Sequence, residues 1–259
     1  MGVKRALSLK QLRTLFPSYS FTTLCASNSG VVDTTYITDK YVVKYYERDI
    51  QEFIEFDARI LVHLQACGLS VTKLLDSSDG WYLYKKLQGS SPKTINYFHI
   101  QALARFMAKF HAQKLQSSRE LIQQYNIKKS LHQLKQTDYY FYKKLESLKN
   151  YRPKSDGFIH GDIFRDNTLF KGEKIAVLDF IDGANGSYTF DIAVALLSFN
   201  RAKRSTYTKL FLQTYNQKAP QKIKNKELHK TIKIAAQFYA ILRIVEQKSK
   251  SGAKELIFW

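Results

Sequence analysis

Three polar residues near the middle of the chain have the types and the spacing that phosphoryl transfer requires. Asp162 follows an apolar run, Asn167 lies five residues later, and Asp179 lies twelve residues after Asn167. Transfer to a hydroxyl needs a carboxylate that orients the hydroxyl and accepts its proton, and hard oxygen ligands that hold Mg²⁺. The spacing predicts Asp162 as the catalytic base and Asn167 and Asp179 as metal ligands. The alternative, that each residue only caps a turn, suits one such residue better than three.

A β-hairpin is expected to bring the metal ligands together. Asn167 begins the first expected strand, Asn167–Phe170, and Asp179 ends the second, Lys174–Phe180, with a Lys-Gly-Glu turn between them. A hairpin of this length places the amide and the carboxylate side by side. Asp162, at the end of the preceding strand, then stands close to both.

The elements around this hairpin form two parts. The chain up to Leu87 is rich in β-branched and aromatic runs with one main helix, and beyond the connection Gln88–Pro92 it is mainly helical. The expected strands are 20–26, 31–38, 40–47 and a pair around 76–80, and the expected helices are 9–15, 50–66, 121–148, 190–199, 205–215 and 226–245, with a further apolar helical stripe over 100–110. Helix 9–15 is expected to begin at a capping box of Ser8 and Gln11, and Gly68 is expected to end helix 50–66. The pattern predicts an α+β fold with lobes at residues 1–88 and 89–259.

The composition is that of a folded protein with a strong basic excess. The 259 residues are 44% hydrophobic, and 41 Lys and Arg against 22 Asp and Glu give a net charge of +19. Such an excess raises nucleic acid, an anionic membrane or a phosphorylated small ligand as partners. Because lysines recur at helical spacing in 128–154 and 222–230, without a nucleic-acid-binding motif, we expect solvated helix faces and no nucleic-acid partner.

The sequence carries no mark of secretion or of a membrane span. Cys25 and Cys67 lie far apart without CxxC spacing, which favours free thiols in a reducing compartment. Residues 1–15 contain no continuous apolar segment, and no apolar run approaches the roughly 18 residues of a membrane span. We expect a soluble, cytoplasmic protein with no membrane partner. The oligomeric state stays open.

The motif around Asp162 resembles that of a known family. His160-Gly-Asp-x4-Asn, followed by Asp179-Phe and by Phe190-Asp-Ile-Ala, is similar to the aminoglycoside phosphotransferase and choline kinase-like branch of the protein-kinase fold. The resemblance implies a two-lobed, protein-kinase-like fold with a small β-rich N-lobe that contains one main helix. The larger, mainly helical C-lobe would contain the catalytic hairpin. It also implies ATP and Mg²⁺ as cofactors.

A narrower resemblance concerns the substrate. Residues 162–170, 178–180 and 190–196 are similar to the signature of bacterial homoserine kinases of this fold, although Gly161 stands where those kinases commonly have Ala. The looser likeness covers most of the chain. It implies transfer of the γ-phosphoryl group of ATP to the hydroxyl of L-homoserine, a step in threonine biosynthesis.

The resemblance assigns Lys44 to the α- and β-phosphates of ATP, paired with an acid from the following helix. Apolar residues flank Lys44 in its strand, so the ammonium needs an anionic partner. Of Glu55 and Asp57 we favour Asp57, because it lies four residues from both Phe53 and Leu61 and faces the apolar side of the helix. The alternative is an ordinary edge-strand lysine.

The other nucleotide contacts are expected at two turns. The chain has neither a GxGxxG loop nor a Walker loop, so the turn 27–34, with Ser29 and Gly30, is expected to reach phosphate through backbone amides and small hydroxyls. By itself this stretch would be an ordinary hairpin turn. The backbone from Leu83 to Gln88 is expected to meet adenine.

Homoserine is a zwitterion, so its site needs a cation and an acceptor. Arg165 is predicted to bind the carboxylate, since its planar fork can do so in two places, and Arg243 is a second choice. Arg165 could equally anchor the loop. Asp182 and Asn185 are predicted to face the ammonium, while His160 and Asp191 are expected to brace the catalytic loop.

Two rival functions stay open. The first is a kinase of this fold with another alcohol substrate. Choline would need an aromatic or acidic cage, and an aminoglycoside would need an acidic cleft, which a chain with so few acidic residues disfavours. The second is a catalytically silent, basic RNA-binding protein, against which the complete set of expected catalytic residues argues.

Overall fold

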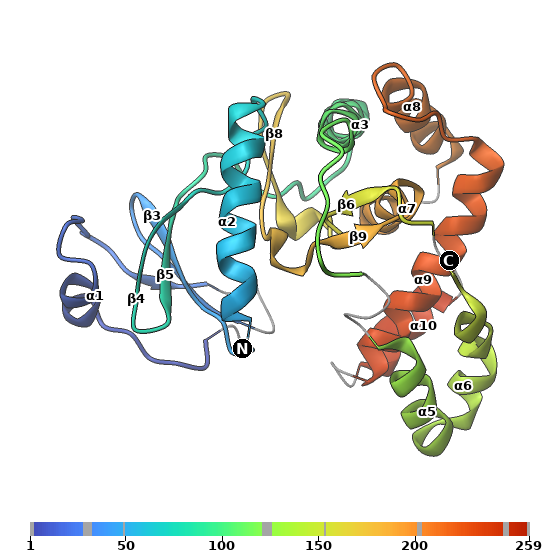
Figure 1. Cartoon of the computed structure of the whole chain (residues 1–259), viewed down its shortest axis with the longest axis horizontal. Coiled ribbons are helices and arrows are strands. Elements are labelled where there is room, and N and C mark those ends of the chain that lie inside the picture. The colour runs from blue at the N-terminus through green and yellow to red at the C-terminus, as the bar shows by residue number, and fades with distance from the viewer. Residues whose placement is uncertain are drawn as a thin grey trace. The chain divides into compact units, whose positions relative to one another are not determined.

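The computed structural model describes residues 3–27, 33–48, 50–120, 126–152, 154–200, 204–245 and 249–257. The chain forms two compact units, Met1–Ser91 with Thr168–Ile181, and Pro92–Asn167 with Asp182–Trp259. The predicted α+β organisation is confirmed, since the first unit holds an antiparallel sheet and the second is mainly helical (Figure 1). The units differ from the predicted lobes 1–88 and 89–259, because the hairpin at 168–181 packs with the first unit.

The first unit is built on a five-stranded antiparallel sheet. Its strands follow the order β1 (Cys25–Ala26), β2 (Thr34–Ile37), β3 (Tyr41–Tyr45), β5 (Trp81–Lys85) and β4 (Leu74–Ser78). Asp79 and Gly80 join β4 to β5, and their positive φ angles of 49° and 78° suit a two-residue hairpin turn. The strand expected over 20–26 is reduced to β1. Because β3 is central, the edge-strand interpretation of Lys44 is wrong.

Two helices cover opposite faces of this sheet. Helix α1 (Leu9–Leu15) begins at the predicted capping box of Ser8 and Gln11, and its apolar residues pack with Val43 and Leu83. Helix α2 (Gln51–Ala66) packs its Ile54 against Tyr46, at the other face, as expected from strand alternation. Figure 1 shows α2 running alongside β3 and β5. Lys44, between Val43 and Tyr45, therefore belongs to the α2 face.

The hairpin of β7 (Thr168–Lys171) and β8 (Lys174–Val177) is joined to the first unit by backbone hydrogen bonds. Ser90 exchanges hydrogen bonds with Phe170, and the Val177 amide donates to the Ser70 carbonyl at 3.0 Å. Gly89 permits this approach, because a Cβ at residue 89 would lie 2.7 Å from the Phe170 carbonyl oxygen. These bonds explain why the hairpin groups with the first unit.

The second unit is mainly helical. Helix α7 (Tyr188–Phe199) is buried along nearly all its length and packs against α9 (Asn225–Val245), while α3 (Tyr97–His111) packs against α8 (Ser205–Tyr215). Strand β6 (Gly157–Ile159) pairs with β9 (Ala184–Gly186), and α10 (Lys250–Ile257) packs against α9. Strand β9 and helix α10 were not predicted. None of the helices in the described ranges has the length and apolar character to span a bilayer.

The single helix predicted over 121–148 is wrong for the part that the structure describes. Helix α5 (Ile127–Thr137) ends at Asp138, and α6 (Tyr139–Leu145) begins there, followed by the 3₁₀ turn η1 (Glu146–Asn150). Asp138 has an extended φ of −154°, and its side chain accepts a hydrogen bond from the Phe141 amide. A helix N-cap therefore replaces the continuous helix. Residues 121–125 lie outside the described ranges.

Candidate active site

The loop that follows β6 joins the predicted base to a predicted metal ligand. Asn167 donates from Nδ2 to the Asp162 Oδ2 at 2.9 Å and to the Asp162 carbonyl oxygen at 2.9 Å. The amide nitrogen thus holds the carboxylate, and the amide oxygen of Asn167 takes no part in these two bonds. This oxygen has the hard character that Mg²⁺ selects.

The carboxylate of Asp191 accepts hydrogen bonds from the backbone of the same loop. Its Oδ1 accepts the Gly161 amide at 2.8 Å, and its Oδ2 accepts the His160 amide at 3.3 Å. His160 Nδ1 in turn accepts the Asp162 amide at 3.1 Å, and the Tyr239 hydroxyl donates to the Gly161 carbonyl. His160 and Asp191 thus brace the loop, as expected.

A buried group behind Asp191 was not found from the sequence. His111 Nε2 lies 3.0 Å from Asp191 Oδ2, its Nδ1 lies 2.8 Å from the Tyr215 hydroxyl, and the Tyr188 ring stacks on the imidazole at 4.2 Å. The side chains of His111 and Asp191 have no exposed surface. His111 lies four residues after Met107, on the apolar stripe of α3, and this position was the available signal.

In the first unit, Lys44 Nζ lies 2.8 Å from Asp179 Oδ1. The ion partner of Lys44 is therefore Asp179, and not Asp57 as predicted, because Asp179 lies two residues beyond the end of β8 and reaches the α2 face of the sheet. Asp57 does face inward, with 4% of its surface exposed. Asp179 has a φ of 62°, a left-handed backbone that a non-glycine residue adopts at some energetic cost.

Two tyrosines lie among these carboxylates. The hydroxyls of Tyr46 and Tyr84 are 2.9 Å apart, and both residues are buried. Burial raises the pKa of both phenols above the ordinary value, and the charges of Asp179 and Asp57 raise each pKa further. Both tyrosines therefore stay neutral, and their hydroxyls add no charge beside Lys44.

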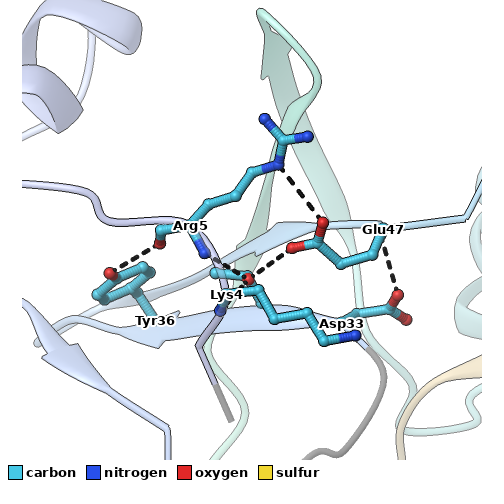
Figure 2. Close-up of polar contacts among 6 residues, drawn as sticks. Lys4, Arg5, Asp33, Tyr36 and Glu47 are labelled. Carbon is cyan, nitrogen blue, oxygen red and sulfur yellow. Dashed lines mark hydrogen bonds and ion pairs between the residues drawn. The ribbon is translucent and has the colours of Figure 1, made fainter. Parts of the chain in front are cut away.

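The predicted phosphate turn is only partly within the described residues. Ser29 and Gly30 lie outside them. At the start of β2, Thr34 Oγ1 accepts the amides of Lys4 and Arg5 at 2.9 and 3.2 Å and donates to Glu47 at 2.8 Å. Figure 2 shows this N-terminal segment, with the Arg5 Nε directed at the Glu47 carboxylate. The N-terminal segment is therefore hydrogen-bonded to β2, the strand that follows the predicted phosphate turn.

Gln88, at the end of the segment predicted to contact adenine, has a hydrogen-bond partner in the β7–β8 hairpin. Gln88 Oε1 accepts a hydrogen bond from Lys171 Nζ at 2.5 Å, so the side chain of Gln88 ties the connection to the hairpin. The amides of Leu87 and Gln88 donate to no backbone carbonyl within the ranges that the structure describes, whereas Lys85 and Lys86 do. The contact with adenine stays a prediction.

The residues predicted to bind the substrate lie in several elements of the second unit. Arg165 donates from its guanidinium to the Lys93 carbonyl at 3.2 Å, and its amide donates to Ser198 at 3.1 Å, which fits the anchoring alternative. Arg243 donates to the Gly252 carbonyl at 3.2 Å and so links α9 to α10. Asp182 is half-buried at the end of the 3₁₀ turn η3 (Phe180–Asp182). Asn185 lies in β9, where its Oδ1 accepts the Ser117 amide at 2.7 Å.

The two residues predicted to bind Mg²⁺, Asn167 and Asp179, offer an amide oxygen and a carboxylate. Asn167 immediately precedes β7, and Asp179 follows β8 by two residues. Both donors are oxygen atoms, the ligand type that Mg²⁺ prefers. No group of three or more His, Cys, Asp or Glu is gathered elsewhere among the described residues.

A comparison with protein families identifies the chain. The model of a family described as phosphotransferase enzymes (APH) matches residues 25–224. A homoserine kinase from Polaromonas naphthalenivorans (strain CJ2) is 23% identical over an alignment of 199 residues, and the match covers 64% of this chain. The match spans 62% of the length of that relative.

The fold is similar to that of solved antibiotic phosphotransferases. Macrolide 2'-phosphotransferase MphH from Brachybacterium faecium has a TM-score of 0.68 at 16% identity, and the match covers 96% of this chain and 98% of that one. The streptomycin–ATP ternary complex of APH(2")-IIa has a TM-score of 0.60 at 20% identity, and the match covers 96% and 95% of the two chains. These similarities establish a protein-kinase-like fold.

Proposed function

Because this chain belongs to the phosphotransferase enzyme family, we propose that it transfers the γ-phosphoryl group of ATP to the hydroxyl of L-homoserine. The observation that carries the proposal is the hydrogen bond from Asn167 to the Asp162 carboxylate at 2.9 Å, within a loop braced by Asp191. An oriented carboxylate of this kind suits the removal of a proton from an alcohol.

In the proposed reaction, the hydroxyl oxygen attacks the γ-phosphorus while the bond to the leaving oxygen of ADP breaks. Asp162 orients the hydroxyl and accepts its proton. Lys44 contacts the α- and β-phosphates, for which its ammonium would exchange the Asp179 carboxylate. Mg²⁺, when bound, would offset the phosphate charge, with Asn167 and Asp179 as its protein ligands.

The nucleotide is proposed to enter against the first unit. The free amides of Leu87 and Gln88 support contacts with the base, while the turn with Ser29 and Gly30 is proposed to cover the phosphates. Asp57 is no longer proposed as the direct ion partner of Lys44. It is proposed instead to contribute negative charge beside the Tyr46 hydroxyl, whose pKa is raised first by burial and to a smaller extent by this carboxylate.

Homoserine as the acceptor is supported by the 162–170 motif and by the homoserine kinase relative. Arg165 is proposed to bind the substrate carboxylate while it keeps its hydrogen bond to the Lys93 carbonyl. Asp182 is proposed to bind the ammonium. Arg243 is the weaker choice, because it already bridges two helices. The substrate would be met in the cytoplasm.

A second acceptor class is suggested by the structural neighbours. Macrolide and aminoglycoside phosphotransferases share the fold, but a polycationic aminoglycoside would have to approach a chain with a net charge of +19. Charge repulsion therefore disfavours aminoglycosides more than it disfavours a zwitterion or a macrolide.

The test is the release of ADP from MgATP upon addition of L-homoserine, choline, kanamycin or erythromycin. We expect turnover with homoserine, and loss of it in Asp162→Asn by roughly 10²–10⁴-fold. Asp166→Asn is the matched control, because Asp166 is an exposed acid in the same 3₁₀ turn (η2, Arg165–Asn167). Turnover with another acceptor and none with homoserine would replace the proposed substrate. Equal loss in both variants would overturn the assigned base.

A further inference from the structure

A cavity in the second unit lies apart from the residues assigned to the reaction. It has a volume of about 360 Å³, within the size range of small-molecule sites. Its walls come from the start of α5, the end of η1 and the middle of α9, and the lining residues are Asn126, Ile127, Lys128, Leu148, Lys149, Tyr151, Arg152 and Phe238. No residue with a predicted catalytic or nucleotide role is among them.

The charged residues in this lining are all cations. Lys128, Lys149 and Arg152 form no ion pair with a carboxylate in the part of the chain that the structure describes. No carboxylate is in the lining: Glu146 pairs with Lys143 at 2.8 Å and Asp138 with Lys250 at 2.7 Å. Glu227 of α9 accepts from the Thr189 hydroxyl at 3.4 Å, and Asp156 is the acid whose charge reaches the lining, at Tyr151. The three cations are exposed at the rim, and the Arg152 guanidinium also donates to the carbonyls of Lys149 and Tyr151 at 3.0 and 2.9 Å. Three cations at the rim of one cavity favour an anionic ligand.

The remainder of the lining is apolar. Ile127, Leu148 and Phe238 are buried, and the Tyr151 ring is half-buried. Burial raises the pKa of Tyr151 to about 12, so its hydroxyl stays neutral at physiological pH and adds no negative charge. A ligand that suits both parts of the lining has an anionic head and an apolar or aromatic body.

Aromatic contacts connect the cavity to the catalytic loop. The Phe238 ring lies 5.4 Å from Phe190, which precedes the loop brace Asp191. The next residue, Tyr239, donates to the Gly161 carbonyl and packs edge-on against Phe164 at 5.0 Å. Phe238, in the cavity wall, is therefore next in the chain to Tyr239 and in contact with the neighbour of Asp191. Tyr239 and Asp191 are the two residues that hold the Asp162 loop.

We infer that this cavity binds a small organic anion, a carboxylate or phosphate attached to an apolar body, and that its occupancy stiffens the catalytic loop through Phe238 and Tyr239. The inference does not depend on the identity of the phosphoryl acceptor. A ligand that restricts the motion of Phe238 restricts the residues packed against it as well.

The binding test uses phenyl phosphate as the probe in isothermal titration calorimetry, with excess ADP present to occupy nucleotide phosphate sites. We expect one-to-one binding of phenyl phosphate and none of benzyl alcohol. The double variant Lys128→Gln/Lys149→Gln should bind roughly tenfold more weakly or worse. Lys129→Gln/Lys154→Gln is the matched control, because it removes two exposed lysines of the same region that do not line the cavity.

An equal loss of affinity in both double variants would mean that the probe responds to overall charge, and would overturn the site. The absence of binding to the unmodified chain would overturn it as well. The link to the loop is read separately, by hydrogen exchange of the peptide that contains residues 158–164. We expect slower exchange with the probe in the unmodified chain and a smaller change in Phe238→Leu. Binding without any change in exchange would overturn the link.

Discussion

Lys44 Nζ and Asp179 Oδ1 are 2.8 Å apart, although the two residues come from segments of the chain that are separated by the whole first part of the second unit. The side chains are only 18% and 31% exposed, so the ion pair is partly shielded from solvent. A cation assigned to phosphate and a carboxylate assigned to a metal thus neutralise each other. A change in either residue should therefore affect both phosphate binding and metal binding.

The first prediction separates the metal ligand from the base. Asp179→Asn removes an anionic oxygen, so we expect a lower Mg²⁺ affinity and partial recovery of turnover at high Mg²⁺. Asp162→Asn removes the base, and we expect no recovery at any Mg²⁺ concentration and nearly unchanged nucleotide affinity. The measurement is the rate of ADP release against Mg²⁺ concentration. Rescue of Asp162→Asn by Mg²⁺ would show that the two roles are assigned the wrong way round.

The second prediction concerns Lys44. Lys44→Met should raise the KM for MgATP by roughly 10- to 100-fold, because the phosphates lose a charged donor. Lys85→Met is the control, since it removes an exposed lysine from the adjacent strand β5. Steady-state kinetics at several ATP concentrations decide the matter. A normal KM in Lys44→Met would remove Lys44 from the nucleotide site.

The third prediction uses the buried pair of hydroxyls on Tyr46 and Tyr84. Either single change to Phe leaves the other buried hydroxyl without its partner, so each should lower the free energy of unfolding by about 1–2 kcal/mol. The double change to Phe should cost less than the sum of the two. Urea unfolding of the four proteins measures this coupling. Strict additivity would contradict a direct bond between the hydroxyls.

The fourth prediction concerns pH. The hydrogen bond from Lys250 lowers the pKa of Asp138 below its ordinary value, so the unfolded chain binds more protons at this residue than the folded chain in acid. The contribution of the carboxylate is complete above about pH 4 and is lost as the pH falls through the folded pKa. Asp138→Asn keeps a capping oxygen but no charge. Its deficit in stability should therefore be largest near neutrality and disappear in strong acid.

Thermal unfolding between pH 2 and pH 7 measures this difference for the unmodified chain and for Asp138→Asn. Glu173→Gln is the control, because Glu173 is an exposed acid in the β7–β8 turn. A deficit that stays constant with pH would mean that the charge of Asp138 contributes nothing.

Much of the fold could be predicted from local signals. The capping box of Ser8 and Gln11, the helix stop at Gly68 and the helix Ser205–Tyr215 follow from residue types and spacing, and the structure confirms them. The break at Asp138 was missed, because lysine-rich helical periodicity continues across it. Strand β9 was missed, because a strand of three residues is too short to show an alternating pattern. It is recognised by its pairing with β6.

The candidate site was predictable where one loop carries it. The Asp162 and Asn167 pair lies within five residues, so spacing alone brought them together. The partner of Lys44 was predicted wrongly, because helix periodicity places Asp57 on the inner face but does not reveal which carboxylate comes within bonding distance. His111 shows the same limit, since its partners Asp191 and Tyr215 come from distant helices.

The division of the first unit between Met1–Ser91 and Thr168–Ile181 has a consequence for synthesis on the ribosome. Domains generally fold as units while the chain emerges from its amino end. Here the sheet can form early, but Ser90 finds its partner Phe170 only after residue 170 has been translated, and Lys44 finds Asp179 later still. A nascent chain stalled before that point would expose the surface that the hairpin covers, which makes this interval a natural one for chaperone binding and for aggregation.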